Sequence, residues 1–160
     1  MRWWLPDADG TARLGGAIAR SCPWEAPGPR LLFLSGELGA GKTTLAAAVL
    51  GALGLEETVR SPSYALLESY ELPAGSALHL DCFRLADPRE LEQLGLRDYY
   101  RQRVLWVVEW PERGGSMLPA PDLAVMLKVE KGGRDALVKP RGDAGVRWLR
   151  QLALQLPGQS

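Results

Sequence analysis

The stretch Gly36-Glu37-Leu38-Gly39-Ala40-Gly41-Lys42-Thr43, followed by Thr44, decides the fold of this 160-residue chain. Its pattern of one glycine, four residues and then Gly-Lys-Thr is typical of a phosphate-binding loop in nucleoside triphosphatases. Glycines let backbone N–H groups curl around an anion, because no Cβ atom obstructs them. The loop therefore predicts a nucleotide-binding set: Gly36, Gly39, Ala40, Gly41, Lys42, Thr43 and Thr44.

Two side chains of the loop have distinct expected roles. Lys42 reaches the β- and γ-phosphates and belongs to the catalytic set, and the Thr43 hydroxyl is a ligand for Mg²⁺. An ordinary glycine turn with a solvated lysine is the alternative. The context disfavours it, because an apolar run at 31–34 predicts a buried strand and apolar residues at helical spacing follow in 44–53. Strand, glycine loop and helix is the setting that phosphate binding requires.

A second informative stretch is Val104-Leu105-Trp106-Val107-Val108-Glu109. Five apolar residues predict a central buried strand. A carboxylate at the end of such a strand is typical of a Walker B site, where Asp is the usual residue, and it holds Mg²⁺ directly or through water. Alone, Glu109 would be an ordinary loop residue; paired with the phosphate loop, it is predicted to be a metal ligand and part of the catalytic set. Trp110 is expected to pack against the core rather than shape the site.

Another carboxylate, Asp81, ends the predicted strand 77–80. That strand and residues 64–70 are joined by a short turn, which predicts an antiparallel hairpin. A carboxylate at a strand end near phosphates is a candidate to contact Mg²⁺ or water, so Asp81 joins the catalytic set. His79 is the only histidine, and we expect a structural or hydrogen-bonding role for it rather than metal binding.

Ser61-Pro62-Ser63 follows the phosphate-loop helix. In many phosphate-loop proteins this region carries hydroxyl groups that sense the γ-phosphate, which makes Ser61 and Ser63 switch candidates. A plain Ser-Pro turn is an equally good interpretation of these residues.

The remaining elements are predicted from periodicity and capping signals. They comprise an edge strand at 2–5, a helix with Thr11 as N-cap, and a helix capped by Asp87 and ended by Gly95. A short helical piece beginning at Asp98 follows it. A hairpin turns at 131–134 with Arg134 at its tip, and a C-terminal helix follows with Trp148, Leu149, Leu152 and Leu156 on one face.

Composition bounds the class of protein. With 46% hydrophobic residues, 24% charged residues and zero formal net charge, no global field favours nonspecific nucleic-acid or membrane binding. Cys22 and Cys82 match neither a disulfide framework nor a zinc spacing. No apolar run is long enough for a membrane span. We therefore expect a single soluble domain over residues 1–160, located in the cytoplasm.

The motifs also exclude some activities. The chain lacks an Asn-Lys-x-Asp guanine motif and a Leu-Ser-Gly-Gly-Gln signature, so a GTPase and a transporter ATPase are disfavoured. A small-molecule kinase remains an alternative, with Arg97, Arg101 and Arg103 as candidates for an arginine-bearing lid. A non-catalytic, ATP-dependent assembly factor is the other alternative.

Read together, several stretches resemble the TsaE family, the bacterial ATPases of threonylcarbamoyl-adenosine tRNA modification. The resemblance runs in order to Gly133-Arg134 and differs at Ser63, where threonine is usual, and at Cys82-Phe83, where Leu-Tyr is usual. Its segments are TARLGGAIA at 11–19, GELGAGKTT at 36–44, VRSPSY at 59–64, HLDCFRL at 79–85, ELEQLG at 90–95 and VEWPE at 108–112.

The resemblance implies a three-layer α/β phosphate-loop fold with a mixed β-sheet. It implies ATP and Mg²⁺, with Thr43 and Glu109 as metal ligands, and it adds Thr11 and Arg134 to the nucleotide contacts. It further implies TsaD and TsaB as protein partners, with tRNA contacted mainly through their complex. Weak ATPase activity alone, rising with these partners, is the corresponding expectation.

Overall fold

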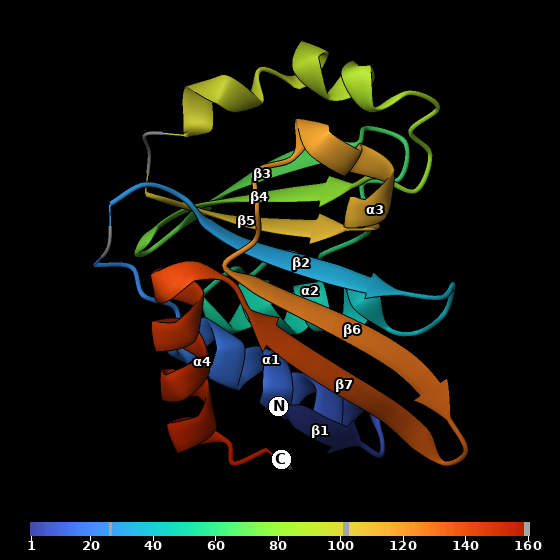
Figure 1. The fold of residues 1–160 in the computed structure, drawn as a ribbon, viewed down its shortest axis with the longest axis vertical. Helices are drawn as coiled ribbons and strands as arrows, with labels where there is room; N and C mark the ends of the chain where they lie inside the picture. The colour runs from blue at the N-terminus through green and yellow to red at the C-terminus, as the bar shows by residue number, and fades with distance from the viewer. Residues whose placement is uncertain (26, 101–102, 159–160) are drawn as a thin grey trace.

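The computed structural model describes residues 1–25, 27–100 and 103–158. Within these ranges, one mixed sheet has the strand order β1-β7-β6-β2-β5-β4-β3 (Figure 1). The predicted α/β class with a mixed sheet is thereby confirmed. The strands are β1 (Arg2–Leu5), β2 (Arg30–Gly36), β3 (Leu67–Leu72), β4 (Gly75–Asp81), β5 (Val104–Glu109), β6 (Leu123–Glu130) and β7 (Gly133–Pro140).

Helices cover both faces of this sheet, which makes three layers (Figure 1). One face carries α1 (Ala8–Arg20), α2 (Lys42–Ala52) and α4 (Gly142–Gln155). The other carries the short α3 (Pro111–Gly114) and the 3₁₀ helices η1 (Pro88–Leu94), η2 (Leu96–Tyr99) and η3 (Gly115–Met117). None of the helices in the described ranges has the length and apolarity that a membrane crossing demands.

The two cores differ in extent. On the first face, Leu14 and Ile18 of α1 and Leu45 of α2 are fully buried. On the second face, Leu91 of η1 and Trp106 of β5 belong to a separate apolar cluster over β2, β5 and β4. The layer on the second face therefore leaves the β6, β7 and β1 end of the sheet open, where Trp4 is 44% and Met126 53% exposed.

The parallel part of the sheet positions the site. β2 runs parallel to β5 and β6, and β5 runs parallel to β4. Leu34 is opposite Glu109, and Glu109 is opposite Asp81. The carboxyl ends of parallel strands share one edge of a sheet, and ligands of such folds bind there. The phosphate loop and both predicted carboxylates consequently meet at this edge.

Helix boundaries correct two predictions. Thr11 is not the N-cap of α1: the helix starts at Ala8, and the Asp7 side chain accepts a hydrogen bond from Gly10 N at 2.7 Å. Asp7 precedes the first helical turn, so its oxygen reaches an N–H that lacks an intrahelical partner. The helical piece expected from Asp98 is η2, which begins earlier, at Leu96.

Other boundaries agree more closely. Asp87 and Glu90 form the predicted capping box, and Gly95 ends η1 with φ +66°, although the helix is of the 3₁₀ type. The hairpin β3–β4 is antiparallel as predicted, but β3 begins at Leu67. Leu66 has φ +63° and its N–H donates to Pro62 O, so a turn occupies the start of the predicted strand.

Candidate functional site

A cavity of about 360 Å³ lies beside the phosphate loop, where the carboxyl ends of β2, β5 and β4 meet. It collects residues from the loop, from the 61–63 segment and from the two strand ends that sequence analysis singled out. Its lining consists of Leu38, Gly39, Gly41, Lys42, Thr43, Thr44, Ser61, Ser63, Asp81, Phe83, Arg84, Glu109, Trp110 and Arg134.

Glycine is required at two points of the loop. Gly36 has φ +140°, and a Cβ there would come within 2.3 Å of Leu127 O on β6. Gly41, the N-cap of α2, has φ +103°, in the left-handed region. Both conformations are costly for residues with a Cβ atom, and they let the loop turn directly from β2 into α2.

The Lys42 side chain folds back and binds carbonyl oxygens of its own loop. Its Nζ donates to Gly36 O at 2.7 Å and to Glu37 O at 2.8 Å, and it lies 3.7 Å from the centre of the Trp110 ring. Burial lowers the pKa of Lys42 below its usual value, and the nearby carboxylates, Glu109 foremost, partly oppose this shift. A phosphate group in the cavity would meet a cation that is incompletely compensated.

Trp110 carries a strained backbone at the rim of the cavity. It has φ +54° and precedes Pro111, a combination that is unfavourable for a bulky residue. Its N–H donates to Leu34 O at 3.2 Å, and its ring packs 4.9 Å from that of Phe83. Trp110 therefore packs against the apolar cluster, as predicted, and it also lines the cavity and covers Lys42, so it shapes the site as well, the role that the sequence ranked second.

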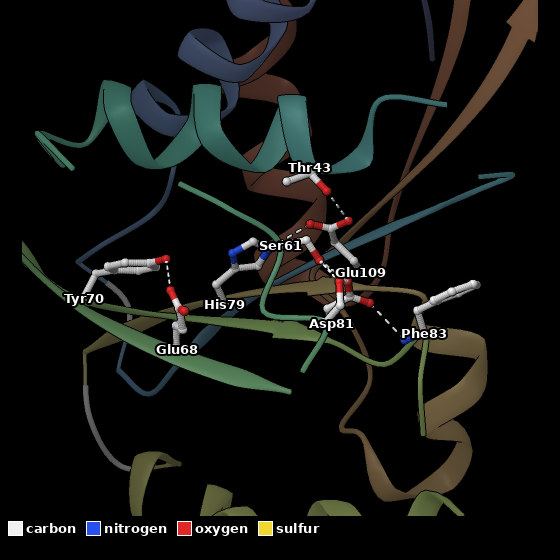
Figure 2. A network of polar contacts seen from close by, with 9 residues as sticks. Thr43, Ser61, Glu68, Tyr70, His79, Asp81, Phe83 and Glu109 are labelled. Atoms are coloured by element: carbon white, nitrogen blue, oxygen red, sulfur yellow. Dashed lines mark hydrogen bonds and ion pairs between the residues drawn. The ribbon is translucent and has the colours of Figure 1, made fainter. Parts of the chain in front are cut away.

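Glu109 joins the phosphate loop to the centre of the sheet. Its Oε2 accepts a hydrogen bond from Thr43 Oγ1 at 2.9 Å, while Oε1 lies 2.8 Å from His79 Nε2. Figure 2 shows the carboxylate between Thr43 on α2 and His79 on β4. Glu109 is 2% exposed and His79 is fully buried. The two predicted metal ligands, Thr43 and Glu109, are thus in direct contact.

Asp81 binds the 61–63 segment instead. Its Oδ2 accepts hydrogen bonds from Ser61 Oγ and, at 3.2 Å, from Ser63 Oγ, and its Oδ1 accepts from Phe83 N at 2.9 Å. The two serine hydroxyls are also 2.9 Å apart. Figure 2 shows Ser61 pointing at Asp81. Both predicted switch residues consequently lie in the cavity wall, attached to a strand end.

Arg134 reaches the loop from the neighbouring hairpin. It lies on β7, and its Nε donates to Ala40 O at 2.8 Å across the sheet edge. Thr11, the other nucleotide contact implied by resemblance, is not among the cavity-lining residues. Its hydroxyl donates to Asp7 O at 3.3 Å within α1, and the side chain is buried. Arg84 lines the cavity without having been predicted there, with its guanidinium 4.1 Å from the Tyr64 ring centre.

The arginines proposed for a kinase lid are not gathered at this cavity. Arg97 lines a separate pocket beside Leu91 and Tyr100, and Arg103 is absent from the lining of the phosphate-loop cavity. Arg101 lies outside the described residues. The described part of the structure thus offers no observation that favours the kinase alternative.

Comparisons with known proteins place the chain in a family. Residues 5–136 match the family model described as "Threonylcarbamoyl adenosine biosynthesis protein TsaE". The chain is 43% identical over 95 residues to the tRNA threonylcarbamoyladenosine biosynthesis protein TsaE of Haemophilus influenzae, an alignment covering 59% of this chain and 60% of that protein. It is 33% identical over 117 residues to the tRNA threonylcarbamoyladenosine biosynthesis protein TsaE of Bacillus subtilis, an alignment covering 73% of this chain and 68% of that protein.

A solved structure shares the fold. The crystal structure of Bacillus subtilis YdiB superposes with a TM-score of 0.79 and covers 96% of this chain and 94% of that one. The sequence identity of this pair is 22%, so the likeness concerns the arrangement of the elements alone.

Proposed function

The chain belongs to the TsaE family of threonylcarbamoyl adenosine biosynthesis proteins, and from this premise we propose that it binds and hydrolyses Mg-ATP as a subunit of that tRNA modification machinery. The observation that carries the proposal is the contact between Thr43 Oγ1 and Glu109 Oε2, 2.9 Å apart at the mouth of the phosphate loop. It joins the two elements on which every phosphate-loop nucleoside triphosphatase depends.

The nucleotide is ATP in this proposal. The loop supplies backbone N–H groups and the N-terminus of α2 for the phosphates, together with Lys42. The chain has no Asn-Lys-x-Asp motif to recognise guanine. Arg134, which lines the cavity and donates to Ala40 O in the loop, is the proposed further contact, whereas Thr11 is buried within α1 and is not part of the proposed site.

The residues present suit Mg²⁺. Thr43 Oγ1 and Glu109 Oε2 are hard oxygen donors that already adjoin each other, which is the chemistry this cation prefers. No group of three or more His, Cys, Asp or Glu side chains with metal-binding geometry occurs in the described ranges. This agrees with Mg²⁺ sites that take only one or two protein ligands and otherwise use phosphate oxygens and water. When bound there, the cation would neutralise charge on the phosphates.

The chain's own side chains divide the remaining work. Lys42 leaves the Gly36 and Glu37 carbonyls to bind phosphate oxygens. Asp81, with Ser61 and Ser63, orients the attacking water and responds to the γ-phosphate. The arginines of the cavity lining already have partners, Arg84 the Tyr64 ring and Arg134 the loop carbonyl Ala40 O, and we assign neither as an arginine finger on the γ-phosphate. Hydrolysis by the isolated chain is therefore slow.

Partners complete the proposal. We take TsaB and TsaD as the stimulating subunits, with tRNA contacted mainly through their complex. The formal net charge of zero supports this division, because direct phosphate-backbone binding ordinarily needs a basic surface.

Phosphate release with and without TsaB and TsaD tests the proposal, with Lys42→Ala as the inactive reference. We expect slow turnover alone and clear stimulation by the complex. Fast unstimulated turnover would contradict it.

A phosphorylated metabolite, detected with γ-labelled ATP, would favour a kinase. Full function of a Glu109→Ala variant that binds but does not hydrolyse ATP would favour the assembly-factor alternative.

A further inference from the structure

We propose that His79 is a positioning residue: it holds the Glu109 carboxylate in the orientation that presents Oε2 to Thr43. This inference rests on the proposed function, because it assigns a role toward the Mg²⁺ site.

Strand register creates the contact. His79 and Asp81 are two residues apart on β4 and so face the same side of the sheet. Their partners across the parallel pair are Val107 and Glu109. His79 therefore lies diagonally behind Glu109, one pair deeper in the sheet. From there its Nε2 reaches Glu109 Oε1 at 2.8 Å, and neither side chain is more than 2% exposed.

The two carboxylate oxygens of Glu109 have separate partners. Oε1 faces His79 and Oε2 faces Thr43. A buried carboxylate with a single partner can rotate about its terminal torsion, which is soft. The histidine contacts Oε1, so its hydrogen bond leaves Oε2, the oxygen beside Thr43, available to a metal ion. Second-sphere hydrogen bonds of this type orient metal ligands and affect metal affinity.

A purely structural role explains the position less well. His79 Nδ1 is buried and has no hydrogen-bond partner in the described part of the chain. A buried polar atom without a partner disfavours folding. Ala77 on β4 and Val107 opposite His79 on β5, which face the same side of the sheet as His79, are apolar and fully buried. Stability alone would favour an apolar side chain at position 79, and the one hydrogen bond that the ring makes with the described residues is to Glu109.

Three substitutions separate positioning from packing. His79→Gln keeps a donor close to the position of Nε2, whereas His79→Asn resembles the Nδ1 side and does not reach Glu109. His79→Leu removes both nitrogens and retains apolar volume. ATP affinity is measured by calorimetry over a series of free Mg²⁺ concentrations and in EDTA, and urea unfolding reports the folding of each variant.

We expect the asparagine and leucine variants to need at least about tenfold more Mg²⁺ for half-maximal strengthening of ATP binding, with unchanged affinity in EDTA. The glutamine variant should follow the wild type. In a Glu109→Ala background, the leucine substitution should have no additional effect, because the positioned group is gone. The leucine variant keeps the test informative if the asparagine variant does not fold.

An unchanged Mg²⁺ requirement in the folded leucine or asparagine variant overturns the positioning role. An equal rise in the Mg²⁺ requirement on His79→Leu substitution, whether residue 109 is Glu or Ala, also overturns it. A wild-type protein that binds no Mg-ATP would instead overturn the proposed function, and the inference with it.

Discussion

Asp81 and Glu109 are opposite each other on adjacent parallel strands, yet their carboxylates accept hydrogen bonds from different hydroxyl groups. Glu109 binds Thr43 at the start of α2, and Asp81 binds Ser61 and Ser63 in the loop that precedes β3. One carboxylate is therefore attached to the phosphate loop and the other to the predicted switch segment. Their substitutions should have separable effects.

Thr43→Ala should weaken ATP binding in Mg²⁺ by more than about tenfold and leave binding in EDTA nearly unchanged, because a metal ligand and the partner of Glu109 are lost together. Thr43→Ser keeps the hydroxyl and serves as the matched control. Titration calorimetry under both conditions provides the measurement. Equal losses with and without Mg²⁺ would argue against a metal role for Thr43.

The double variant Ser61→Ala/Ser63→Ala should lower partner-stimulated kcat by roughly ten- to a hundredfold, with ATP affinity changed much less, because Asp81 loses both hydroxyl partners. Ser69→Ala, on the exposed side of β3, is the control. Steady-state phosphate release and nucleotide titration separate the two quantities. A parallel loss of affinity and kcat would indicate that the serines bind nucleotide directly rather than act as a switch.

Nucleotide binding should change tryptophan fluorescence. The Lys42 ammonium lies 3.7 Å from the centre of the Trp110 ring, and bound phosphates would attract it away. The change should disappear in Trp110→Phe, which removes this one of six tryptophans. Lys42→Met should abolish it as well, together with a more than tenfold loss of affinity. Survival of the full signal in Trp110→Phe would assign it to another tryptophan.

Gly36→Ala should destabilise the protein by more than about 3 kcal/mol, since the new Cβ combines positive φ with a severe clash. The clash is with Leu127 O, 2.3 Å from the Cβ position. Gly39→Ala also has positive φ but meets no atom within 4 Å, so about 1 kcal/mol is expected there. Urea unfolding of the nucleotide-free proteins gives both values. Similar losses of unfolding free energy at the two sites would mean that β6 shifts to make room for the new Cβ at position 36.

Cys82 should be inert toward thiol reagents in the folded protein. Burial raises its pKa from 9.0 to about 12, so only about one thiol in 10,000 is ionised at pH 8. Burial also raises the pKa of Cys22. Iodoacetamide at pH 8 should label neither, and both after unfolding in urea. Labelling of Cys82 under native conditions would show that β4 opens at its end.

The same shift has a stability consequence. The folded thiol stays protonated where the unfolded thiol ionises, so the free energy of unfolding should fall as the pH rises from about 9 toward 12. Cys82→Ala should show a weaker decline than the wild type over that window. Urea unfolding at a series of pH values measures it, and identical pH profiles would contradict the buried, protonated thiol.

Much of the candidate site was predictable because its elements have strong local signals. The loop at 36–44 and the apolar strand ending in Glu109 specify their own backbone. Thr11 shows where such signals mislead: it is a good N-cap residue by type, but Asp7 fills that place and starts the helix earlier. Arg84 gave no local signal, and the contact between Trp110 and Lys42 could not be predicted locally, since both depend on segments that lie far away along the chain.

The phosphate loop, the order of strands and helices along the chain, and the family can be inferred from the sequence alone, since these follow from short-range periodicity, capping and motif spacing. Which side chains touch depends on how the strands pair in three dimensions. His79 meets Glu109 because β4 pairs with β5 in one particular register, and Arg134 meets Ala40 because β7 returns beside β6. Such contacts join residues 30 and 94 positions apart. Their register follows from packing the whole sheet, because slipping one strand by a single residue would turn its side chains to the opposite face.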